Sequence, residues 1–331
     1  MSFNVSALSN YTKENEALLV TSSVLGAKTA ALIQSAGNVM VGVKSAETIN
    51  IMDTDAVFQA GGTCGWNASG ATTFSQRAVT IGKIKVQESL CPKALEAKYL
   101  QKALPTGSTY DSIPFEEEYS KKKAATIAAQ LETALWQGDT DSVNVNLNKF
   151  DGFVKLIGAA SGVVAANAST YISGAPLSSI TAANVVSIFD GVYKAIPSKI
   201  VAADDVVIVC GDYVFRTYTI ALKNANMFNY TFDGKANGEL VLAGTTIKIV
   251  ALQGLNGTNK VYAMRTSNMF LGTDLLNEQE KFEIFFAKEA DEVRFAAEFK
   301  MGVNVARIAV VVGVLRQVVD QGFHGCLRLL F

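Results

Sequence analysis

Histidine is nearly absent from this chain of 331 residues, in which His324 is the single example. Cysteine is scarce as well, and the four residues lie far apart without a C-x-x-C pair: Cys64, Cys91, Cys210 and Cys326. One histidine excludes a His-rich metal site, and any catalytic triad would have to use it. Scattered cysteines argue against structural zinc and a disulfide framework, so we expect no metal, no cofactor and reducing surroundings.

Charged residues make up only 18% of the chain, and they balance at 29 basic and 30 acidic. Without a basic excess or stripe, general nucleic-acid binding is not expected. Apolar residues reach 49% and the mean hydropathy is +0.23. The longest apolar run, Ile308–Leu315, falls short of the roughly 20 residues that a membrane span needs. No basic segment followed by an apolar core opens the chain, so no signal peptide is expected. The apolar excess therefore predicts burial against other subunits.

A long amphipathic helix is the clearest element, predicted over residues 114–138. Pro114 suits a first helical turn, three glutamates follow it, and Gly138 is a natural stop. The apolar positions have helical spacing: Ala124, Ile127, Ala128, Leu131, Ala134 and Leu135. Such a rod with one narrow apolar stripe indicates a structural element rather than an active site. Little else in the chain indicates catalytic chemistry.

The region before this helix indicates β structure. Residues 48–58 and 78–86 carry β-branched side chains, and the Gly-rich stretch Gln59–Thr73 between them predicts an exposed loop tip. A phosphate-binding loop is not favoured, because neither a Walker motif nor G-x-G-x-x-G is present. Residues 1–40 favour an extended arm with a short helix near 14–24, and residues 91–104 a short helix.

The second half alternates helices and strands, as in an α/β unit. Thr181 is the expected N-cap of the first helix, with core positions Val185, Ile188, Phe189 and Val192. The other expected elements are a strand at Asp205–Cys210, a helix at Tyr213–Leu222, and strands at Glu239–Leu252 and Val261–Arg265. Lys281–Phe299 alternates apolar and polar residues on both sides of a turn, which predicts a hairpin with one buried face.

Cys210 is the one enzymatic candidate, since it stands between a predicted strand and a predicted helix, as nucleophiles on a sharp elbow do. A helix N-terminus can lower a thiol pKa. However, its neighbours Val206–Val209 favour an inert buried cysteine, and the base would have to be His324. We therefore expect no catalytic residue, and a cysteine-dependent enzyme stays an alternative.

The order of these elements resembles the major capsid proteins of tailed bacteriophages, with the Hong Kong 97-type shell fold. Three stretches carry the resemblance: Ala124–Asp139 as the end of a spine helix, Val206–Tyr218 in an axial domain, and Met269–Ala306 as late strands of a peripheral domain. The resemblance spans about residues 45–306. It implies an α+β fold with an N-terminal arm, an extended β loop, a peripheral domain with the spine helix, and an α/β axial domain.

The resemblance also implies a role for each region. The implied regions are an N-terminal arm at 1–45, an extended β loop at 46–90, a peripheral domain at 91–150 and 275–306 with the spine helix at 114–138, and an axial domain at 151–274. Residues 307–331 depart from the family pattern, because their composition shifts and includes the single histidine. A lineage-specific extension and a reading-frame change would both give such a tail.

The function that the resemblance implies is structural: self-assembly into an icosahedral capsid that encloses packaged double-stranded DNA. Expected partners are copies of the chain in hexamers and pentamers, a separate scaffolding protein, portal and decoration proteins, and DNA through non-specific contact, with no membrane. The expected location is the virion, after assembly in the bacterial host cytoplasm. An encapsulin-type compartment is the alternative within the same fold.

Overall fold

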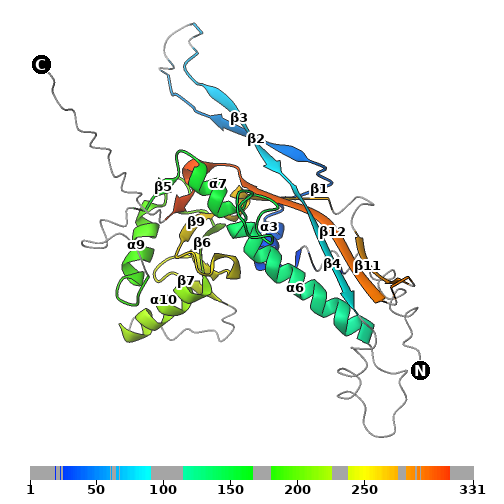
Figure 1. The fold of residues 1–331 in the computed structure, drawn as a ribbon. Coiled ribbons are helices and arrows are strands. Elements are labelled where there is room, and N and C mark those ends of the chain that lie inside the picture. The colour runs from blue at the N-terminus through cyan, green and yellow to red at the C-terminus, as the bar shows by residue number, and fades with distance from the viewer. Residues whose placement is uncertain are drawn as a thin grey trace, which may run out of the picture.

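The structure is a computed structural model. It describes residues 19, 23, 25–59, 61, 65–66, 68–90, 115–166, 180–225, 238–274, 281–287, 289–290 and 292–313. The short helix expected near 14–24, apart from Leu19 and Ser23, and the helix expected at 91–104 lie outside these residues. Figure 1 shows three parts: a body with a long helix, a smaller α/β layer beside it, and a projecting β hairpin.

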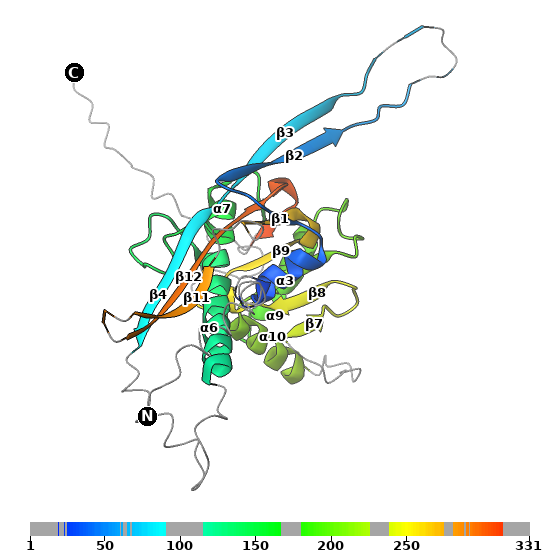
Figure 2. The same ribbon diagram turned by 90° about the vertical axis from the view of Figure 1, so that its right-hand side faces the viewer.

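The long helix α6 covers Phe115–Gln137, one residue inside each predicted bound. All six predicted apolar positions are buried, and Trp136 is buried with them. They pack against a sheet of β1 (Val39–Val41), β4 (Gly82–Leu90), β10 (Met269–Thr273), β11 (Lys281–Ala287) and β12 (Glu292–Val305). The spine helix therefore lies along the sheet, as Figure 2 shows.

The hairpin of β11 and β12 confirms the predicted alternation. Phe282 and Ile284 are buried, and on β12 so are Val293, Phe295, Ala297 and Phe299. The middle of β12 pairs on one edge with β11 and on the other with β4. Beyond Phe299 the alternation ends, and Lys300–Val305 are all buried. This end of β12 pairs with β10, and the root of the hairpin formed by β2 (Ala46–Thr54) and β3 (Thr72–Thr80) covers its outer face.

The second sheet has the strand order β5-β13-β9-β6-β8-β7 in the described chain. These strands are β5 (Val164–Ala165), β6 (Val206–Cys210), β7 (Glu239–Val241), β8 (Lys248–Ala251), β9 (Val261–Arg265) and β13 (Val312–Gly313). Helices α9 (Val185–Ala195) and α10 (Asp212–Asn224) cover one face. The core around α6 covers the other, so both faces of β6 are buried, as its unbroken apolar run requires.

Residues 28–41 and 307–313, which belong to the expected arm and tail, pack on the body. Helix α3 (Lys28–Ser35) packs on the core, and β1 pairs in parallel with β10. At the other end, β13 pairs with β9 and β5, and Val311 and Val312 are fully buried. Strand β1 thus belongs to the first sheet and β13 to the second, while helix α3 packs on the core.

Three element boundaries were predicted wrongly. Helix α9 begins at Val185, so its N-cap residue is Asn184 and not Thr181, and no side chain caps it. The Asn184 side chain instead accepts a hydrogen bond from the Thr181 N–H at 2.8 Å, in the turn before the helix. The strand expected at 78–86 is two strands, β3 (Thr72–Thr80) and β4, which meet at Ile81. The strand expected at 239–252 is likewise split into β7 and β8. The four core positions named for α9 are buried as predicted.

Candidate assembly surfaces

The β2–β3 hairpin projects from the body and joins it only at its root, within the part of the chain that the structure describes (Figures 1 and 2). Strand β2 covers Ala46–Thr54, and its nine residues pair in register with β3. Beyond the strands the hairpin carries large apolar side chains in solvent: Phe58 is 99% exposed and Trp66 is 95% exposed. A two-stranded hairpin is marginally stable alone in water, so this element needs a further contact.

The root of the hairpin is packed on the body through an apolar cluster. Ile49, Ile51 and Val79 are buried there, next to Met40, Phe270 and Ala306. Because Ile49 and Ile51 point to one side of β2, this side of the hairpin faces the body. The cluster fixes where the hairpin leaves the sheet.

Two polar side chains, one near the end of β12 and one just after it, also hold the root. Asn304 donates its side-chain N–H to the Ala78 carbonyl at 2.6 Å. Arg307 donates to the Met52 carbonyl at 2.9 Å and pairs with Asp53 at 3.1 Å. Arg307 thus belongs to the hairpin joint, although the sequence assigned it to an atypical tail.

Helix α3 is attached to the spine helix through a buried carboxylate. Ala27 at its N-cap cannot cap it, and Glu132 of α6 does so instead. The Thr29 N–H and hydroxyl donate to the two Glu132 oxygens at 2.9 and 2.6 Å, and Trp136 Nε1 donates to Thr29 Oγ1 at 2.7 Å. Burial raises the pKa of Glu132, and the hydrogen bonds from Thr29 lower it in part. Sequence reasoning missed this residue, because the partners are 103 positions apart.

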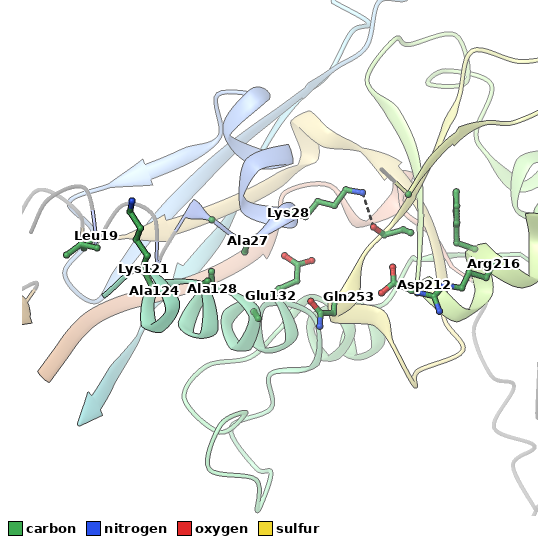
Figure 3. A pocket seen from close by; sticks show the side chains of 16 residues that line it. Leu19, Ala27, Lys28, Lys121, Ala124, Ala128, Glu132, Asp212, Arg216 and Gln253 are labelled. Atoms are coloured by element: carbon green, nitrogen blue, oxygen red, sulfur yellow. Dashed lines mark hydrogen bonds between the residues drawn. The ribbon is translucent and has the colours of Figure 1, made fainter. Parts of the chain in front are cut away.

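A groove of about 970 Å³ runs between α3, α6 and α10 (Figure 3). Glu132 points from α6 toward α3, and Lys28 at the far wall donates to the Ala251 carbonyl at 3.2 Å. Alanines of α6 line much of its floor, and the charges are mixed, with Lys121, Asp212 and Arg216 on its walls. Mixed charges over small side chains suit packing between elements and give no centre for chemistry.

The end of the spine helix is held by a lysine among three carboxylates. Lys155 Nζ lies 2.6 Å from Asp139, 2.7 Å from Asp141 and 2.9 Å from Asp151. The hydrogen bonds to these carboxylates raise the pKa of Lys155, and the bond to Asp139 contributes most. At Gly138 an added Cβ would lie 2.5 Å from the Phe150 carbonyl oxygen, so glycine is required by close approach. The acidic residues after the helix thus close a loop.

Cys210 lies at the end of β6 as predicted, but it is fully buried, and burial raises the pKa of its thiol to about 12. A thiol that holds its proton at neutral pH is a poor nucleophile. Its neighbours come from the core beneath α9 and α10, and His324 lies outside the described residues. The geometry therefore does not favour the cysteine-dependent enzyme. In the described ranges no group of three or more His, Cys, Asp or Glu side chains is arranged so that it could hold a metal ion, and no helix there is long and apolar enough to cross a membrane.

Several solved structures share this arrangement. A chain of the satellite phage P4 procapsid, solved with its size determination (Sid) protein, matches with a TM-score of 0.60 over 96% of this chain and 91% of that one, at 11% identity. The Hong Kong 97-type fold of phage capsid proteins is the fold of this chain.

Two further structures with this capsid fold support the assignment. A Gordonia phage Cozz structure matches with a TM-score of 0.55 over 85% of each chain, at 8% identity. The capsid of an empty GTA particle matches with a TM-score of 0.52 over 85% of this chain and 88% of that one, at 12% identity. No protein-family model and no curated protein matches the sequence. At these identities the likeness is one of fold, so the capsid fold is established through structure alone.

Proposed function

We propose that this chain is the structural subunit of an icosahedral phage capsid that encloses packaged double-stranded DNA. The observation that carries the proposal is the β2–β3 hairpin, which leaves the body with two large aromatic side chains almost fully exposed. An element of this kind has no use in a monomer and becomes stable when a neighbour covers it. The structures that share the capsid fold come from a procapsid and a capsid, which fits this role.

The division into arm, extended loop, peripheral domain and axial domain, which the resemblance implied, is part of this proposal with two changes. The extended β loop is 46–90, of which β4 also belongs to the body sheet. The peripheral domain is 91–150 and 275–306 with the spine helix, and the axial domain is 151–274. Residues 28–41 join the peripheral sheet through β1, and residues 307–313 join the axial sheet through β13. This leaves the N-terminal arm before residue 28 and the tail after residue 313.

Assembly in this proposal is geometric. Copies form hexameric and pentameric rings, and the hairpin of each copy reaches a neighbour. Each contact can be weak, because a closed shell makes many of them at once and the linked contacts act together. The partners would be the chain itself, scaffolding, portal and decoration proteins, and packaged DNA without sequence preference, and the location would be the virion. The role is structural, with no catalytic step.

The test is expression of the full chain, alone and with its neighbouring phage genes, followed by sedimentation and electron microscopy. We expect closed shells or rings, and in phage-infected cells shells that protect double-stranded DNA from nuclease. Shells that hold a protein cargo and no DNA would indicate the encapsulin-type compartment instead. A strictly monomeric chain in every preparation would overturn the proposal.

A further inference from the structure

An asparagine–glycine pair, Asn256–Gly257, follows the short turn η3 (Gln253–Leu255) in the loop between β8 and β9. In such a pair the glycine nitrogen can attack the side-chain amide carbon of the asparagine and close a five-membered ring, because glycine has no Cβ to hinder the approach. An added Cβ at Gly257 would meet nothing within 4 Å. Among the residues that the structure describes, none accepts a hydrogen bond from the Gly257 N–H. The attacking nitrogen is therefore unhindered and unpaired within this part of the chain.

The N-terminus of α10 holds the side-chain amide of Asn256. The Asp212 N–H, in the first turn of α10, donates to Asn256 Oδ1 at 2.7 Å. The Asn256 amide N–H donates in return to Asp212 Oδ2 at 2.8 Å. Gly211 permits this close approach, since an added Cβ would lie 2.9 Å from the Leu255 carbonyl oxygen and 3.1 Å from Asn256 Oδ1. The two bonds fix the plane of the amide and place its carbonyl oxygen at the positive end of the helix.

The backbone donor at Asp212 lies where negative charge would develop during ring closure. When Gly257 N adds to Asn256 Cγ, the charge collects on Oδ1, the atom to which the Asp212 N–H already donates. A fixed donor to a developing oxyanion lowers the barrier, and removal of one such donor slows acyl-transfer reactions typically about 10²–10³-fold. The same bond that attaches the loop to α10 thus favours the attack on Asn256.

We propose that Asn256 is a self-modifying residue, which converts to aspartate and isoaspartate in the folded chain. Gly257 N loses its proton to a base in solvent and forms a bond to Asn256 Cγ. The bond from Cγ to Nδ2 breaks, Nδ2 takes up a proton from water and leaves as ammonia, and a succinimide ring remains. Water then opens either carbonyl of the ring, so the net change is the uptake of one water and the loss of one ammonia. Both residues are exposed, which gives water access.

The product would detach the loop from its two supports. A carboxylate at position 256 cannot donate to Asp212, so two carboxylates would meet where an amide now bonds to one. In isoaspartate the main chain runs through the former side chain and gains a methylene, which displaces the carbonyl that accepts the Gln137 amide N–H at 3.0 Å. The modification therefore loosens the loop from α10 and from the end of α6. It does not depend on the proposed function.

The test is incubation of the purified full chain at mildly alkaline pH, followed by peptide mapping with mass spectrometry. Trypsin cuts after Lys248 and Lys260, so the peptide 249–260 contains Asn256 and also Asn259, which lysine follows and which serves as the internal reference. We expect Asn256 to change from amide to acid about tenfold or more faster than Asn259, and isoaspartate to appear among the products. An intact Asn256, or equal rates at the two positions, would overturn the proposal.

A matched pair of variants isolates the backbone donor. Asp212→Ala removes the carboxylate and keeps the N–H, whereas Asp212→Pro removes both. Proline suits this first helical position, and Gly211 before it is extended at ψ 158°, as a residue before proline should be. We expect Asn256 to react about tenfold or more slowly in Asp212→Pro than in Asp212→Ala. A proline variant that reacts as fast as the alanine variant, or faster, would show that the bond only restrains the amide, and the assigned role of the donor would fail.

A variant that copies the product measures the consequence. Asn256→Asp should lower the melting temperature by about 2–4 °C, because it replaces a hydrogen bond to a carboxylate by a pair of like charges. In the Asp212→Ala background the same substitution should lower it much less, since the second carboxylate is gone. Equal decreases in both backgrounds would contradict the clash between positions 212 and 256.

Discussion

Gly302→Ala perturbs the joint between the body and the hairpin. Gly302 lies in β12 directly beneath the point where β3 becomes β4. A Cβ added there would lie 2.1 Å from the Thr80 carbonyl oxygen and 2.9 Å from the Ile81 Cα, while ordinary contacts begin at 3.4 Å. Both neighbours are backbone atoms, so no side chain can rotate away. The Thr80 carbonyl would have to move by more than about 1 Å, and the whole root would move with it.

Overpacking of this kind costs typically about 1–3 kcal/mol. At about 2.1 cal/mol/K per residue, the unfolding entropy of 331 residues is about 0.7 kcal/mol/K, so each kcal/mol lowers the melting temperature by roughly 1.4 °C. We therefore expect a decrease of about 1–4 °C by differential scanning fluorimetry. Particle yield, measured by sedimentation, should fall further than the melting temperature suggests, because a displaced root misdirects every hairpin in the shell.

The matched control is Gly158→Ala in α7 (Phe153–Ala159), where an added Cβ meets nothing within 4 Å. It should keep wild-type yield and raise stability by up to about 1 kcal/mol, because alanine favours helix over glycine. If Gly302→Ala melts and assembles like Gly158→Ala, the root is not a packed joint, and the reasoning about the hairpin fails.

Three further predictions concern the spine helix and the hairpin root. Leu131→Asp should remove both fold and particles, since it loses a buried leucine worth about 2–5 kcal/mol and buries a charge, whereas Thr126→Asp on the exposed side should still fold, as circular dichroism would show. The raised pKa of Glu132 means that folding takes up a proton there; the resulting stability is complete below its ordinary pKa of about 4.3 and is lost as pH rises through the raised value. In Glu132→Gln the melting temperature should therefore depend less on pH above about 4.3 than in wild type. An unchanged pH dependence would contradict a raised pKa of Glu132. Arg307→Ala removes an exposed pair with Asp53 worth about 0–1 kcal/mol, so melting should barely change while hydrogen exchange in β2 and β3 rises; unchanged exchange would show that Arg307 does not hold the hairpin.

The sequence predicted the elements whose periodicity depends on one buried face. The stripe of α6, the core face of α9 and the alternation of β11 and β12 all follow from residue spacing, and all are confirmed. The order of these elements led to the capsid fold without a catalytic or binding motif.

Contacts between distant segments were not predictable in the same way. The Glu132 cap of α3 joins residues 103 positions apart, and Arg307 reaches Met52 across 255 positions. A lone glutamate in a helix or an arginine after a strand has no local pattern that indicates its partner. The pairing of β1 and β13 in the two sheets was not predicted for the same reason, because β1, β5 and β13 are strands of two or three residues that depend on the pairing of neighbouring strands.

The most direct test of the account is a single-particle reconstruction of the assembled protein. The account predicts a closed shell in which each β2–β3 hairpin extends over a neighbouring copy and the side chains of Phe58 and Trp66 are covered by protein. A preparation without shells, or a shell in which the hairpins stand free in solvent, would contradict it.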